Sequence, residues 1–287
     1  MATDIQFDAN NFRPGEPIDN NQSNYLQYTP GTTFRYNTYD AKGVLTEVRT
    51  VTVTNQTKVI DGVTCIVVTD VVKDATTGAL IESTKDYFAQ DKDGNVWYFG
   101  EDAKNYNYDN AGNLISTDTT GSWLAGKTKL PGGGLAAPGV VMEATPKVGD
   151  TYNQENAPGV AEDQATVTSL TGQASVPAGT FTNLLVTLDL NPLDTSKKGN
   201  LSERENKYYA AGIGEVYSQT YVLQGNKYVL AETEQLVSVT SPTGSSQLVQ
   251  AMASFGATPS ASQSPVITAH SDQHTLHNFL ATPGHHT

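Results

Sequence analysis

The chain has 287 residues, of which 37% are hydrophobic, so it is long enough for one large domain or two small ones with a real core. It carries 17 basic against 30 acidic side chains, and this formal charge of -13 repels phosphate backbones and anionic lipid surfaces. Nucleic acid is therefore not an expected partner. No stretch approaches the ~20 apolar residues of a membrane span, so the sequence predicts none.

Residues 1–31 are predicted to form an irregular lead that packs over a folded domain. Asn and Gln are frequent there, and Pro14, Pro17 and Pro30 interrupt any regular element. The first residues have neither the basic n-region nor the apolar h-region of a secretory signal peptide. Export through a signal peptide is therefore not expected from the sequence as written.

Residues 32–240 are predicted to form one antiparallel β-domain. Val51 and Val53 alternate with threonines, as a half-buried strand requires. Turn-like stretches separate successive strand-like runs at residues 40–43, 75–78, 91–94, 109–112 and 224–226. Because their spacing is uneven, we expect no repeat architecture but an all-β meander that forms a barrel or a strongly curved sheet.

The stretch from Thr84 to Asp102 is predicted to be the central hairpin of this domain. Asp93-Gly94 is a strong turn signal, because Gly adopts positive φ without steric cost. Aromatic residues crowd both flanks, so these strands are expected to meet bulky neighbours on both faces. The single Cys65 lies in the apolar run VTCIVVTDVV and is predicted to be a buried hydrophobe, with no intrachain disulfide.

Two later segments carry more specific expectations. Residues 121–150 are rich in Gly and Pro and are predicted to form a long loop. In residues 183–190, one apolar face is predicted for Leu184, Val186, Leu188 and Leu190, with Thr187 and Asp189 on the opposite face.

Residues 241–287 differ in composition from the domain. A short amphipathic helix is predicted over 247–255, followed by an Ala/Ser/Pro/Gly linker and a His-rich tail. His270, His274 and His277 stand four and three residues apart, a spacing that would suit a transition metal if the tail were helical. The alternative is a disordered polar tail.

The stretches DYFAQDKDGNVWYFGED, SWLAG, APGVAEDQATV and KYYAAGIGEVY resemble an uncharacterised family of bacterial secreted or lipoprotein-like domains. This resemblance covers roughly residues 7–221 and implies an all-β fold, but no catalytic residues or ligand. The segment QLVQAMASFGA is similar to the C-terminal region of type I secretion substrates. That similarity implies an extracellular protein exported without a cleaved signal peptide; the alternative is a helix that docks on the barrel.

Several residues are candidates for binding. Asp91, Asp93 and Asn95 partly follow the pattern of a calcium loop, although Gly94 stands fourth where an EF-hand needs Gly sixth, and a plain hairpin turn is the alternative. Trp97, Trp123 and Tyr208 could form an aromatic pocket for a sugar or small hydrophobe, whereas ordinary core packing would explain each singly. Glu155 and Glu162 belong to an acidic group with Glu143 and Asp163. These acids could serve a hydrolase or form a solvated rim.

No GxSxG, HExxH, Walker A or GxGxxG context is present in the sequence. The leading hypothesis is thus an exported, non-enzymatic β-domain that binds a small molecule, glycan or cell-surface component, with calcium or a transition metal as the candidate cofactor. The alternatives are a structural protein that assembles as a homo-oligomer through exposed strands, and a hydrolase that uses the acids of residues 143–163.

Overall fold

The computed structural model describes residues 5–18, 25–26, 28–195 and 200–242. Within them the chain forms a single antiparallel sheet of sixteen strands and one short 3-10 helix, η1 (Ala9–Asn11). The strands are β1 (Thr33–Asp40), β2 (Leu45–Ile60), β3 (Val63–Asp74), β4 (Leu80–Gln90), β5 (Val96–Asp102), β6 (Asn105–Tyr108), β7 (Leu114–Asp118), β8 (Trp123–Leu124), β9 (Ala137–Met142), β10 (Thr151–Asn153), β11 (Glu155–Asn156), β12 (Gln164–Val176), β13 (Gly179–Leu190), β14 (Glu203–Ala210), β15 (Gly214–Gln224) and β16 (Lys227–Thr240). The predicted all-β class is confirmed.

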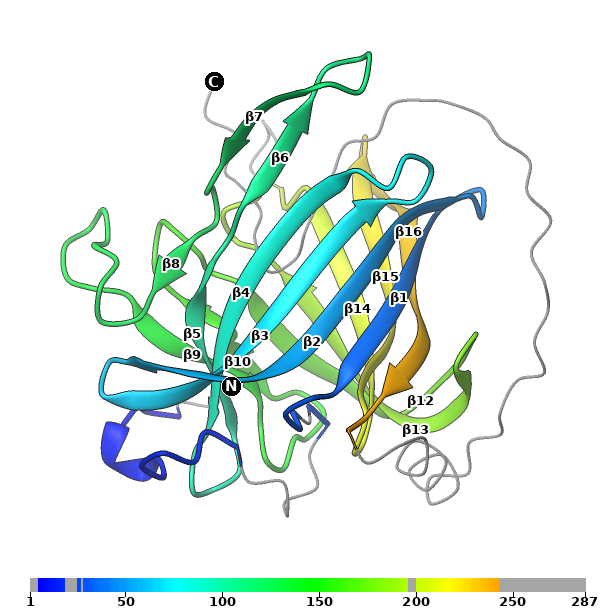
Figure 1. Ribbon diagram of the computed structural model, residues 1–287. Helices are drawn as coiled ribbons and strands as arrows, with labels where there is room; N and C mark the ends of the chain where they lie inside the picture. Colours follow the sequence, from blue (N-terminus) through cyan, green and yellow to red (C-terminus); the bar gives the residue numbers. More distant parts are fainter. Residues whose placement is uncertain (1–4, 19–24, 27, 196–199, 243–287) are drawn as a thin grey trace.

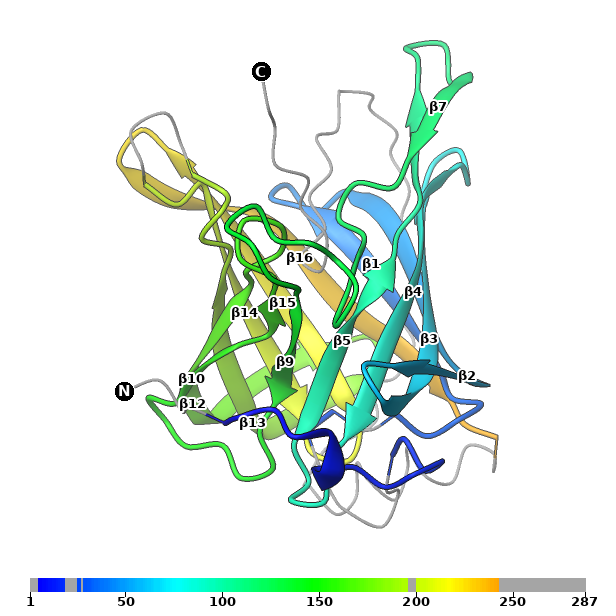
Figure 2. The same cartoon turned by 90° about the vertical axis from the view of Figure 1, so that its left-hand side faces the viewer.

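The sheet curls into a nearly closed barrel (Figures 1 and 2). Its strand order is β10-β12-β13-β14-β15-β16-β1-β2-β3-β4-β5-β9-β11, so β16 pairs with β1 and joins the two halves of the chain. The two ends of this order, β10 and β11, are consecutive in the chain, and β10 lies beside β9. The short segment 151–156 therefore completes the wall.

Gly139 permits the backbones of β9 and of segment 151–156 to approach closely where the wall closes. A Cβ on Gly139 of β9 would collide with the carbonyl of Gln154, which lies between β10 and β11. Any larger residue would have to push the two backbones apart.

The five turns that the sequence marks join paired strands. They connect β1 to β2, β3 to β4, β4 to β5, β6 to β7, and β15 to β16. In the central hairpin, Gly94 has φ 98°, a conformation that a side chain would strain. The observed pairing confirms these turn predictions. Each depends only on the residues of the turn itself, which the sequence gives directly.

The expectation of a long irregular loop over residues 121–150 was wrong in part. Strand β8 pairs with β5 within this segment, and β9 pairs with both β5 and β11. These are short strands whose hydrogen-bonding partners lie far away in sequence. Tertiary pairing therefore overrode the local Gly and Pro signals.

The first part of the N-terminal lead, residues 5–18, packs on the outer face of the barrel. Phe7 and Phe12 contact Trp97 and Phe99 of β5, with ring centroids 5.7–6.1 Å apart. On the inner face of the same hairpin, Phe88 stacks on Tyr98 at 4.8 Å. Both faces of the central hairpin are thus covered by aromatic side chains.

None of the described segments forms a helix long and apolar enough to cross a membrane. Cys65 is buried and free, as expected, and burial raises the pKa of its thiol. The predicted helix over 247–255 and the His-rich tail lie outside the described residues.

Candidate functional site

One part of the barrel interior is polar. Alternate residues of neighbouring strands point inward, and the register aligns them in rows. Thr38 of β1 stands between Glu47 of β2 and Glu234 of β16. In the adjacent row, Thr220 of β15 stands between Glu232 of β16 and Glu205 of β14. Carboxyl and hydroxyl side chains therefore alternate along the wall.

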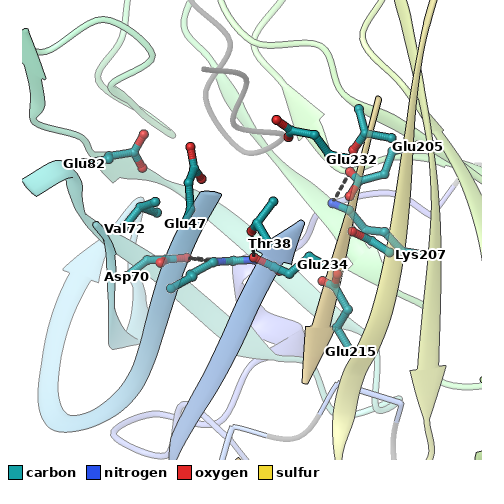
Figure 3. Close-up of a pocket in the computed structure, with 13 residues that line it drawn as sticks. Thr38, Glu47, Asp70, Val72, Glu82, Glu205, Lys207, Glu215, Glu232 and Glu234 are labelled. Atoms are coloured by element: carbon teal, nitrogen blue, oxygen red, sulfur yellow. Dashed lines mark hydrogen bonds and ion pairs between the residues drawn. The ribbon is translucent and has the colours of Figure 1, made fainter. Parts of the chain in front are cut away.

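These side chains line an open cavity, which we call the acidic cavity (Figure 3). Its volume is about 90 Å³. It is lined by Thr38, Glu47, Arg49, Asp70, Val72, Glu82, Glu205, Lys207, Glu215, Ser218, Thr220, Glu232 and Glu234. Seven of these thirteen residues carry carboxyl groups, and two, Arg49 and Lys207, carry cations. The cavity therefore has a large excess of acidic groups.

Arg49 is held between two of the acids. Its Nε lies 2.7 Å from Asp70 Oδ2, and its Nη1 lies 2.8 Å from Glu234 Oε1. The guanidinium carbon also lies 5.6 Å from the centroid of the Tyr36 ring. Asp70 and Glu234 outweigh the effect of burial and raise the pKa of Arg49, so it stays charged.

Lys207 is the second cation and comes from the opposite wall. Its Nζ lies 3.4 Å from Glu205 Oε2 and 3.5 Å from Asp189 Oδ2. Burial alone would lower the pKa of Lys207, but Glu205 and Asp189 together raise it. Each cation is thus already engaged with two carboxyl groups of the protein.

Three other acids of the cavity have raised pKa values. Burial, reinforced by Glu232, raises the pKa of Glu47 to about 8. Burial also raises the pKa of Glu215 to about 8 and, reinforced by Glu234, that of Glu232 to about 7. Part of the carboxyl set therefore holds protons at neutral pH.

A more apolar chamber continues from the acidic cavity and shares Arg49, Lys207 and Glu215 with it. Its volume is about 80 Å³, and its other lining residues are Leu26, Tyr28, Phe34, Tyr36, Val51, Phe88, Val141, Gln154, Tyr209, Ile213 and Gly214. The layer of charges thus separates two chambers of different polarity.

Trp123 and Glu155, both predicted ligand-binding residues, lie together in the interior. Trp123 Nε1 donates a hydrogen bond of 3.2 Å to Glu155 Oε1, and its ring meets Tyr98 edge to face. Burial raises the pKa of Glu155 to about 7. Neither residue lines the acidic cavity or the apolar chamber. The pair packs beside the central hairpin, and its role in ligand binding stays a prediction.

The interpretation of the surrounding acids as a solvated rim was wrong for Glu143, Glu155 and Asp163. Their exposed fractions are only 4%, 4% and 1%. They lie on the segments that complete the wall, where the carbonyl of Asp163 accepts hydrogen bonds from the amides of Gln154 and Glu155. Their position depends on closure of the barrel, which a local pattern does not reveal.

Glu162 and Tyr208 make hydrogen bonds to residues outside the set of predicted ligand-binding residues. Glu162 Oε1 accepts a hydrogen bond of 2.6 Å from the amide of Gly159 and so stabilises its own loop. Tyr208 donates to Gln219 Oε1 and packs against Tyr217. It alternates with the cavity residue Lys207, so it lies on the outer face of β14.

The turn proposed to bind calcium uses its oxygens within the protein. Asp91 Oδ1 accepts from the amide of Asn95, and Asp91 Oδ2 accepts from Asn95 Nδ2 and Trp97 Nε1. Asp93 Oδ2 accepts from Asn11 Nδ2 at 2.7 Å. Trp97 is therefore an outer-face residue that ties the turn to the strand. Calcium binding here stays a prediction.

No group of three or more His, Cys, Asp or Glu residues in the described part of the chain is arranged to hold a metal ion. His270, His274 and His277 lie outside that part, so their proposed transition-metal site stays a prediction.

Sequence reasoning missed the acidic cavity itself. Thr187 and Asp189, which the alternation predicts on the face opposite the apolar one, are both buried, with an exposed fraction of 0%. Register puts Thr187 beside Lys207 and Asp189 beside Glu205, in the polar part of the interior. The available signal was the spacing of charged residues two apart, as at Glu203, Glu205 and Lys207.

Comparisons with known proteins add little beyond this geometry. No family model matches the chain, and no curated protein matches it. It is similar to a presumed exported protein of Bacteroides fragilis with a YmcC-like fold, at 17% identity and a TM-score of 0.41, over 76% of this chain and 99% of that one. It is also similar to a presumed lipoprotein of Parabacteroides distasonis, at 14% identity and a TM-score of 0.39, over 76% and 99% of the two chains.

Proposed function

We propose that this protein is a binding protein that holds a small polar ligand in the acidic cavity of its barrel. The observation that carries the proposal is the cavity itself, an open space inside the sheet with a dense polar lining. Barrel interiors are common ligand sites, because the wall places side chains from many strands around one space.

The cost of this lining supports a functional role. Burying a carboxyl group without full compensation is unfavourable, and apolar residues of similar volume would serve stability better. The same barrel uses such residues elsewhere, for example Val51, Val53 and Phe88. Buried polar residues in place of more stable apolar packing are expected at a ligand-binding site.

A panel of small molecules tests the proposal. We would measure binding of neutral, anionic, zwitterionic and cationic probes by calorimetry to the full chain and to Thr220→Phe, which fills the cavity. Thr233→Phe is the matched control, since Thr233 alternates with Glu232 and Glu234 and so faces outward on β16.

At least one probe class is expected to bind, with affinity at least tenfold weaker in Thr220→Phe and unchanged in Thr233→Phe. If no class binds, or if binding is equal in the two variants, the cavity is not a ligand site.

Action outside the cell is a separate part of the proposal. It is supported by the acidic composition and by the likeness of QLVQAMASFGA to type I secretion substrates. Full secretion of a chain lacking residues 247–287 by the native host would contradict a C-terminal export signal.

A further inference from the structure

We infer that the ligand of the acidic cavity is a small organic dication, with the chemistry of an α,ω-diamine of four or five carbons. This inference rests on the proposed function, because it names the ligand class of the same site. It follows from four properties of the cavity: its charge, an unsatisfied acceptor, the distribution of its acids, and its size.

The charge of the lining favours a cation. Seven carboxyl groups face two cations across the cavity, and each cation is already paired with acids of the protein. An incoming ammonium group would supply the positive charge that the lining lacks, and it would hydrogen-bond to ionised carboxylates. An anionic ligand would add to the repulsion.

The same cavity is lined by a buried hydrogen-bond acceptor that lacks a donor. Asp70 is 7% exposed, and its Oδ2 is bound by Arg49, yet its Oδ1 has no hydrogen-bond donor in the described structure. A buried carboxylate oxygen without a donor is costly. An ammonium group carries three donors and no acceptor, so it is suited to this environment.

The acids are spread over separate walls. In Figure 3, Glu47 and Glu82 stand on one side of the cavity and Glu205 and Glu232 on the other. Glu47 on β2 and Glu205 on β14 are separated by three strands, β1, β16 and β15. A ligand with a charge at each end could reach both sides.

The same distribution disfavours a bare metal ion. A metal needs several ligands converging on one point, and no three acids of the described chain are arranged in that way. Between the acids lie the hydroxyls of Thr38, Ser218 and Thr220 and the methyls of Val72. These groups provide neutral surface for a short carbon chain.

The volume sets the size of the ligand. At roughly 10–15 Å³ of such volume per water molecule, a cavity of about 90 Å³ holds roughly six to nine groups the size of water. A diamine with four or five carbons has six or seven non-hydrogen atoms and falls within this range. A longer polyamine or a disaccharide exceeds it unless it extends beyond the cavity.

The test is calorimetry on the full chain with 1,4-diaminobutane as the probe and butane-1,4-diol, butylamine and calcium chloride as comparisons. The diamine is expected to bind at least tenfold more tightly than butylamine and the diol. The double variant Glu47→Gln/Glu232→Gln should weaken diamine binding at least tenfold. Glu16→Gln, which changes an exposed acid of the N-terminal lead, should leave it unchanged.

Protonation provides a second readout. The titratable groups that face the cavity are Glu47, Arg49, Asp70, Glu82, Glu205, Lys207, Glu215, Glu232 and Glu234. Because some of these acids hold protons at neutral pH, binding of a dication should release protons. Its affinity should therefore rise from pH 6 to pH 8.5, and the double variant should reduce this rise.

The outcomes separate the two proposals. Equal binding of diol and diamine, or calcium binding of equal strength that is lost in the same double variant, would overturn the diamine inference. If another probe binds in the cavity and the diamine does not, the inference fails while the proposed function stands. If no probe binds, the proposed function fails as well.

Discussion

At one end of the barrel interior, around Phe34 and Phe88, aromatic and aliphatic side chains line a chamber of about 80 Å³; at the other, around Glu47 and Glu232, acids line a cavity of about 90 Å³. The same strands build both ends. Burial of apolar surface stabilises the first by ~25 cal/mol per Å², whereas burial of acids costs free energy at the second. The contrast teaches that the apolar end supports the fold while the acidic end is free to serve binding.

The largest effect is expected from breaking the apolar end. Phe88 is 2% exposed, and its ring stacks on Tyr98 and lies 4.5 Å from the ring of Tyr28. Phe88→Ala should lower the free energy of unfolding by about 3–5 kcal/mol through lost contacts and a new cavity. Urea unfolding at pH 7 checks this, and a loss below about 1 kcal/mol would contradict the division of roles.

A smaller loss is expected from removing the charge that joins the two ends. Arg49→Met leaves Asp70 and Glu234 without their shared cation, and breaking a buried pair costs about 3 kcal/mol or somewhat more when the partners are ionised. The loss should be smaller at pH 5.5 than at pH 8.5, because burial raises the pKa of Glu234 and its protonated form needs no cation. The same loss at both pH values would show that Arg49 acts through packing alone.

The acidic end should also make stability depend on pH. Burial raises the pKa of Glu47 to about 8 and that of Glu232 to about 7. The folded state therefore binds more protons than the unfolded state between about pH 5 and 8, so this stabilisation is lost as the pH rises through 7–8. We expect the free energy of unfolding to fall by on the order of 1–3 kcal/mol from pH 5.5 to 9.

A matched pair of variants assigns this fall to the cavity. Glu47→Gln/Glu232→Gln cannot release protons at these positions and should flatten the pH dependence, whereas Glu16→Gln on the lead should leave it unchanged. If both variants keep the slope of the parent protein, its source lies elsewhere among the buried acids, such as Glu203, whose pKa burial raises to about 8.

The sequence predicts the wall of this barrel better than its contents. Turns such as Asp91–Gly94 depend on a few adjacent residues, and the strand alternation around Val51 and Val53 is local as well. The acidic cavity instead takes one to three residues from each of seven strands, β1 to β4 and β14 to β16. Their meeting depends on register and on the pairing of β16 with β1. A single sequence contains no direct record of that pairing.

Other features of the interior depend on register in the same way. The alternation predicts Thr187 and Asp189 opposite the apolar face of their strand, and both are buried because this barrel encloses polar groups. Trp97 and Trp123 are predicted ligand-binding residues because of their type, and each donates its indole N–H to a buried carboxylate. Their role in binding a ligand stays a prediction.

The smallest effect is expected outside both ends, on the hairpin of β6 and β7, which projects from the barrel (Figure 1). Leu114 and Ile115 are 52% and 64% exposed, and β7 pairs only with β6 in the described structure. Leu114→Thr/Ile115→Thr should change the free energy of unfolding by less than about 0.5 kcal/mol, since exposed side chains contribute little. A loss above 1 kcal/mol that depends on protein concentration would show instead that the free edge of β7 pairs with another copy, which sedimentation measurements would detect.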